Sequence, residues 1–188
     1  MNTSDSRGSR LRWLWAFGVL ISLGLFVHCV FGGRTVSDQA GPLPFDATQP
    51  FKLDFGRGSG WHGLDTVAIA QDGQTSLHRS RRDGSWEHSS LRLSPEHIRA
   101  VAQAVARHGL PRLAKEYHTN VADGTQWVLW IRQGQRQKAT YFDNNFPTSI
   151  RDFASELDGI LRSAGYDAVR WQPAKSRDHE KELWNSIK

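Results

Sequence analysis

The feature that most constrains this chain is an apolar run from Trp13 to Phe31, which contains no Asp, Glu, Lys or Arg. At about 1.5 Å rise per residue, a helix of this length spans roughly 28 Å, close to the thickness of the hydrocarbon core of a bilayer. The run therefore predicts a transmembrane anchor over residues 13–31, attached to a polar domain. The large side chains expected to contact lipid are Trp13, Trp15, Phe17, Leu20, Leu23, Phe26 and Phe31.

The charges that flank this run predict its orientation. Arg7, Arg10 and Arg12 precede the run, whereas Arg34 follows it. Because basic residues stay on the cytoplasmic side of a membrane, residues 1–12 are predicted to be cytoplasmic and the rest to be exported. This arrangement predicts a single-pass protein of the bacterial cytoplasmic (inner) membrane.

A cleaved signal peptide is the main alternative to a retained anchor. Signal peptides have a shorter apolar region that ends in a small-x-small cleavage site, and the best match here, Val30 and Gly32, is poor. A lipoprotein anchor at Cys29 would need a small residue before the cysteine, where His28 stands. We therefore expect retention, and cleavage would instead make the protein secreted.

The chain beyond the anchor divides into three parts. Residues 32–50 are rich in Gly, Pro and small polar residues without periodicity, which is typical of a flexible linker. Residues 51–172 carry the periodic patterns of one domain, and residues 173–188 form a charged tail that is either a docked helical turn or a frayed end. The only cysteine lies in the apolar run, so the exported part has no disulfide.

Strand patterns come first in the domain. Alternating apolar residues predict a strand from Phe51 to Phe55, which Gly56, Gly58 and Gly60 are expected to end in a flexible turn. Further strands are predicted over residues 64–70, 74–79 and 85–93. Asp72-Gly73 forms a hairpin turn between the first two of these, and the third carries a bulge near residues 89–90.

Helix signals are equally local. Ser94-Pro95 predicts a capped helix start, and Gly109 its end. Residues 110–124 look irregular, strands are predicted over 125–132 and 136–142, and an amphipathic helix carrying Phe153 and Leu157 on its apolar stripe runs to Gly165. The order ββββαββα predicts an α+β, two-layer sandwich, with about six antiparallel strands and two helices on one face.

The candidate functional residues cluster after the first strand. Trp61 lies in a glycine-rich segment beside His62 and Asp65, which favours an exposed binding loop. The alternative is that Trp61 folds back over the sheet edge as a lid on the core. His62 and Asp65 also resemble the orienting half of a hydrolytic triad, although no activated nucleophile accompanies them.

The chain's eight histidines carry no metal-binding motif, since neither HExxH nor an i,i+4 pair on a helix occurs. His62, His78, His88 and His118 would meet only if strand register brought them together. We predict no bound metal and no cofactor. The formal charge of +5 is spread along the chain without a basic stripe or an RNP-type motif, so no nucleic-acid partner is predicted.

A resemblance adds to this interpretation. The glycine-rich first loop, the DG hairpin, the step LSPEHI and the hairpin WVLWIRQGQRQKATYF are similar to a group of small uncharacterised bacterial exported domains. The layout also resembles emfourin, a small inhibitor of thermolysin-like metalloproteases. The resemblance implies a non-catalytic module that binds a partner, and it transfers no inhibitory residue to this sequence.

The sequence thus predicts a membrane-tethered, exported interaction module with a protein partner in the bacterial envelope. The alternatives are an envelope hydrolase that uses His62 and Asp65, an enzyme with a histidine metal site, and a protease inhibitor.

The retained anchor is directly testable. We expect the protein extracted from membranes by detergent to have the intact mass of a chain that still contains residues 13–31, because these residues hold it in the bilayer. A mature chain that begins near Gly33, recovered without detergent, would contradict this expectation.

Overall fold

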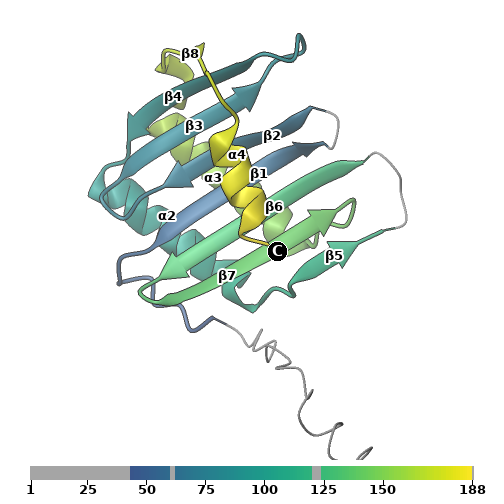
Figure 1. The fold of residues 1–188 in the computed structure, drawn as a ribbon. Helices are drawn as coiled ribbons and strands as arrows, with labels where there is room; N and C mark the ends of the chain where they lie inside the picture. The colour runs from purple at the N-terminus through teal and green to yellow at the C-terminus, as the bar shows by residue number, and fades with distance from the viewer. Residues whose placement is uncertain (1–42, 60–61, 120–123, 188) are drawn as a thin grey trace, which may run out of the picture. The chain divides into compact units, whose positions relative to one another are not determined.

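The computed structural model describes residues 43–59, 62–119 and 124–187. These residues form an α+β domain in which three helices pack on a mixed eight-stranded sheet (Figure 1). The predicted anchor, residues 13–31, lies outside the described residues. Within the described part of the chain, no helix combines the length and the apolar character that a membrane span requires.

The sheet is built around two antiparallel groups of strands. The meander comprises β1 (Lys52–Ser59), β2 (Gly63–Ile69), β3 (Gln74–Ser80) and β4 (Trp86–Arg92). The hairpin comprises β6 (Thr125–Gln133) and β7 (Arg136–Asp143), and β6 pairs with β1. The spatial order is β5-β7-β6-β1-β2-β3-β4-β8.

The two outermost strands correct the predicted sheet. β5 (Glu116–His118) runs parallel to β7, and β8 (Gln172–Pro173) pairs with β4. The described sheet is therefore mixed and has eight strands instead of about six antiparallel ones. Both additions are too short to show the period of two by which a strand is recognised in sequence.

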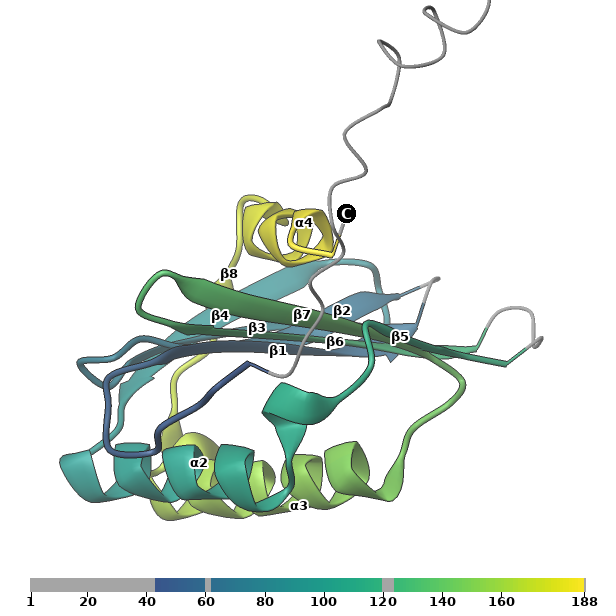
Figure 2. The ribbon, with the colours of Figure 1, turned by 90° about the horizontal axis from the view of Figure 1, so that it is seen from below.

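The helices cover both faces of the sheet. α2 (Pro95–Arg107) and α3 (Thr148–Ser163) lie side by side on one face, and α4 (Asp178–Asn185) lies on the other (Figure 2). Ser94 caps α2 by accepting a hydrogen bond from the backbone N–H of His97, as its sequence predicts. The charged tail is therefore a docked helix preceded by a short edge strand, and the expectation of helices on one face alone is incomplete.

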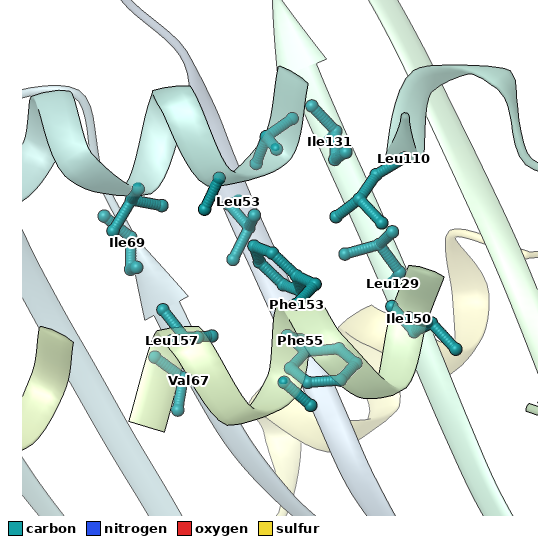
Figure 3. Packing of buried hydrophobic residues seen from close by; sticks show 14 of the residues in the cluster. Leu53, Phe55, Val67, Ile69, Leu110, Leu129, Ile131, Ile150, Phe153 and Leu157 are labelled. Atoms are coloured by element: carbon teal, nitrogen blue, oxygen red, sulfur yellow. The ribbon is translucent and has the colours of Figure 1, made fainter. Parts of the chain in front are cut away.

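The main core lies between the sheet and the α2–α3 layer. Leu53 and Phe55 of β1 meet Phe153 and Leu157 of α3, and each of these four side chains is at most 1% exposed (Figure 3). The predicted apolar stripe of the last long helix is confirmed. Leu110 and Leu113, from the segment expected to be irregular, are also buried in this core.

The glycines of the first strand have a different role from the predicted one. Gly56 and Gly58 lie within β1 and pair with β2 and β6 in continuous register. A Cβ on Gly56 would lie 2.8 Å from the side chain of Leu183 in α4, and one on Gly58 would collide with the carbonyl of Gly63. Gly56 therefore allows close packing of α4, Gly58 allows the close approach of the β2 backbone, and neither residue ends the strand.

The predicted bulge in the fourth strand is absent, since β4 pairs with β3 without interruption from Arg92 to Trp86. The large residues of β4 switch from even to odd positions because both faces of the sheet are covered, so that a large side chain can be buried on either face. Leu91 packs against the α2–α3 core, whereas the ring of Trp86 lies under the guanidinium of Arg177, which precedes α4.

The packed domain begins before Phe51, where the linker was expected to end. Leu43 is buried and donates its backbone N–H to the carbonyl of Pro111 at 2.9 Å. The ring of Phe45 meets that of Phe51 edge to face, and the side chain of Gln133 donates to the backbone carbonyl of Asp46 at 2.8 Å. Residues 43–50 therefore belong to the domain.

This early start predicts a stability difference between two truncated chains. A chain that begins at Ala40 should unfold cooperatively, and a chain that begins at Phe51 should be less stable by about 3 kcal/mol, because it loses the burial of Leu43 and the packing of Phe45. Urea denaturation followed by circular dichroism measures the difference. Equal midpoints for the two chains would show that residues 40–50 act only as a tether.

Candidate functional site

The structure separates the residues that the sequence grouped as a site. Trp61 lies outside the described residues. His62 places Nδ1 3.2 Å from Oγ of Ser59, whereas Asp65 accepts a hydrogen bond from the backbone N–H of Ser80 at 2.8 Å. The proposed His62–Asp65 catalytic pair is therefore not formed. His62 belongs to the turn that precedes β2, whereas Asp65 lies within the strand.

Asp65 instead lines a cleft of about 240 Å³ on the α2–α3 side of the sheet. Strands β1, β2 and β3 form its floor, and the end of α3 with the segment that follows forms its wall. Its main functional side chains are Arg57, Asp65, Asp158, Arg162, Tyr166 and Trp171. No local sequence pattern marks Arg57, Tyr166 or Trp171 as a site, although Arg57 lies two positions after Phe55 and so is predicted to share its face of the strand.

The chain turns sharply to bring the aromatic wall into place. Gly165 follows α3 with a φ of +98°, a conformation that glycine adopts without steric cost. A short 3-10 helix, Tyr166–Ala168, then carries Tyr166, and the chain returns to the sheet through Trp171 and β8. The rings of Tyr166 and Trp171 meet edge to face with their centroids 6.1 Å apart.

A bidentate ion pair joins the floor of the cleft to its wall. The guanidinium of Arg57 donates to both carboxylate oxygens of Asp158, at 2.9 and 2.6 Å. The two side chains are about one-third exposed, and the two parallel bonds fix the geometry of both. The partner of Asp158 is thus a strand residue from a distant part of the chain.

A second guanidinium near the cleft is also fully engaged. Arg79 donates from Nε to Glu87 at 2.8 Å, and its Cζ lies 4.1 Å from the centroid of the Trp171 ring. Arg81 binds the other oxygen of Glu87 at 2.7 Å. The hydrogen bonds from Arg79 and Arg81 hold the pKa of Glu87 below its usual value, so this group stays ionised.

Asp65 differs from these carboxylates in its partners. Its Oδ1 accepts from both the N–H and the hydroxyl of Ser80, and among the described residues no cation lies within ion-pair distance of it. Burial, and then the nearby charge of Asp65, raise the pKa of Tyr166 above its ordinary value. The Tyr166 hydroxyl is therefore protonated at neutral pH and is a hydrogen-bonding group of the cleft.

Three histidines gather on the opposite face, beneath α4. His78 of β3 stands directly opposite His88 of β4, and His179 of α4 stacks on His78 with ring centroids 4.9 Å apart. Strand register thus brings together two of the four histidines considered from sequence. His62 and His118 lie elsewhere, and His179 was not foreseen. Within the described residues, no group of side chains could hold a metal ion.

The interface beneath α4 contains buried polar atoms that have no hydrogen-bond partner among the described residues, namely Thr66 Oγ1, His78 Nδ1 and His179 Nε2. Burial first, and then the neighbouring His179 and His88, lower the pKa of His78 to about 4. Burial also raises the pKa of the Asp54 carboxyl on β1, which His179 and Lys52 partly oppose and Glu182 reinforces. Burial thus disfavours charge on both His78 and Asp54.

Comparison with known proteins supplies no function for either group of residues, because no protein-family model matches this chain and no curated protein resembles it closely enough to count as a relative.

The histidine cluster predicts a pH dependence of stability. An unfolded His78 titrates near pH 6.5 and the folded one near pH 4, so the unfolded chain binds more protons between these values. The contribution of His78 to stability is present above pH 6.5 and falls as the pH drops to about 4. Urea denaturation at pH 7.5, 5.5 and 4.5 should show a shallower decline for His78→Gln than for the natural chain.

The matched control is His62→Gln, at an exposed histidine that is not part of the cluster formed by His78, His88 and His179. Asp54 acts in the opposite direction, because the folded state favours its neutral form and thus gains stability as the pH falls. Both histidine variants keep Asp54, so the difference between their pH slopes does not contain its contribution. Identical pH slopes for both variants would contradict the assignment to His78.

Proposed function

We propose that this protein is a membrane-tethered, exported interaction module that binds an envelope protein through the cleft around Asp65 and Tyr166 and performs no chemistry on it. The apolar run over residues 13–31 supports the tether, with a single pass and a cytoplasmic N-terminus. The cleft of the described domain supports the binding role.

The observation that carries this proposal is the state of the charged groups in the cleft. The Arg57–Asp158 pair holds α3 against β1, and Glu87 with the ring of Trp171 holds Arg79. These contacts preorganise the walls of the cleft, which Asp65 and Tyr166 both line. A preformed concavity with a few fixed polar groups is the usual form of a binding site.

The serine–histidine contacts of the domain favour binding over catalysis at this site. Ser59 contacts His62, and His97 contacts both Ser94 and Ser163, at distances of 3.0 to 3.3 Å. None of these five residues lines the cleft. The hydroxyl of Ser163 also donates to the carbonyl of Ile160 at the end of α3, which occupies its proton. A nucleophile–base pair next to a substrate pocket is what hydrolysis requires.

Site-specific photo-crosslinking in intact membranes tests the proposal. A photo-reactive residue replaces Arg162, which is exposed at the rim of the cleft. We expect a discrete higher-mass adduct, because the partner's bound segment lies within reach of this position.

The matched control places the same photo-reactive residue at Arg151, which is also exposed on α3 but near the start of the helix. An adduct at position 162 that is absent at position 151, and that weakens when Tyr166 is changed to Ala, is the expected result. Equal labelling at both positions, or no adduct at position 162, would remove the cleft as the binding site.

A further inference from the structure

The size of the cleft limits what it accepts. Pockets for drug-sized ligands and cofactors occupy roughly 300 to 1,000 Å³, whereas this cleft holds about 240 Å³. One extended side chain from a partner fits such a volume better than a cofactor-sized molecule does.

The charges of the cleft indicate the sign of the group it accepts. The guanidinium of Arg57 and the carboxylate of Asp158 neutralise each other in a bidentate pair. At the rim, Arg162 and Asp167 are both exposed and have opposite charges. What is left is the negative charge of Asp65, whose Oδ1 is occupied by Ser80 while Oδ2 accepts no hydrogen bond from the described residues.

The groups beside Asp65 suit a cation. Tyr166 lines the same cleft, and its hydroxyl remains neutral because burial and the charge of Asp65 raise its pKa. The oxygen of a neutral phenol accepts a hydrogen bond from a guanidinium or an ammonium. Arg79, which would repel a cationic ligand, does not line the cleft, and its guanidinium is held by Glu87, which also binds Arg81.

We infer that the cleft binds a guanidinium or ammonium group, presented by an arginine or lysine side chain of the partner, through Oδ2 of Asp65 and the hydroxyl of Tyr166. This inference rests on the proposed use of the cleft for binding. A charge-assisted hydrogen bond to the carboxylate is the main recognition element, so the site discriminates by charge as well as by shape. Free polyamines carry the same chemistry as a lysine side chain and are distinguished in the test.

The test uses the full-length chain in detergent with ¹⁵N-labelled tryptophan, and it follows the indole resonance of Trp171, which is assigned by its loss in Trp171→Phe. The probes are acetyl-Gly-Arg-Gly-amide, its citrulline analogue, which has the same shape without the charge, and acetyl-Gly-Glu-Gly-amide. Spermidine tests whether the cleft binds a free polyamine instead of a side chain of a protein. We expect saturable shifts with the arginine peptide, and affinity at least about tenfold lower for the citrulline peptide.

Two variants assign the effect to Asp65. Asp65→Asn retains an oxygen for the N–H of Ser80 and should lower the affinity for the arginine peptide by about tenfold. Asp152→Asn removes one negative charge from an exposed site on α3 outside the cleft, and it should change the affinity by less than about twofold. Thermal melting confirms that both variants remain folded.

The outcomes separate this inference from the proposed function. Equal binding of the arginine and citrulline peptides, or binding of the glutamate peptide alone, would reject the inference of a cationic ligand. It would retain the proposal that the cleft binds a partner. Saturation by spermidine at lower concentration than by the arginine peptide overturns a protein side chain as the ligand. An adduct at position 162 without any peptide shift also rejects the ligand class and retains the proposed function. The absence of both the adduct at position 162 and the peptide-induced shifts would reject the proposed function and the ligand class together.

Discussion

The structure depends on the packing of both faces of β1, an interior strand of the sheet. Its pairing with β2 and β6 satisfies the backbone hydrogen bonds on both edges of the strand. Successive side chains of β1 therefore point alternately toward the α2–α3 layer and toward α4. Leu53 and Phe55 enter the α2–α3 core, where the ring of Phe55 meets those of Trp127 and Phe153 edge to face. Gly56, on the other face, permits the close approach of Leu183 from α4. A larger residue at position 56 would displace the side chain of Leu183 from its place against the sheet.

The cleft follows from the same strand. Arg57 continues the face of Leu53 and Phe55 but lies where the apolar core ends, and its guanidinium reaches Asp158 on α3. The ion pair therefore joins the two layers at the point where apolar packing stops. Beyond it, the turn at Gly165 carries Tyr166 and Trp171 across the opening. The arrangement couples the shape of the candidate site to the strand that organises the fold.

The α4 face is held by a different balance of forces. Leu183 is buried, and Glu180 is 5% exposed while it accepts hydrogen bonds from the N–H of Leu64 and the indole of Trp184 and forms an ion pair with Arg177. These interactions oppose the cost of the unpartnered polar atoms of Thr66, His78 and His179. The short helix is thus attached by few groups, and it packs over His78 and Asp54, whose pKa values burial shifts.

Local patterns in the sequence predicted the elements whose causes are local. The Ser94 cap, the Asp72-Gly73 turn and the stripe of Phe153 and Leu157 are confirmed, because capping, turn geometry and helical periodicity act within a few residues. The apolar run over residues 13–31 remains a prediction of the same local kind. Tertiary structure alone decided that Asp158 binds Arg57 from a distant strand, and that the charged tail docks as α4 and adds His179 to the histidines of β3 and β4. Such choices depend on how strands far apart in the chain align and on which polar groups become buried when the chain folds. Neither can be predicted from the residues next to the group in the sequence.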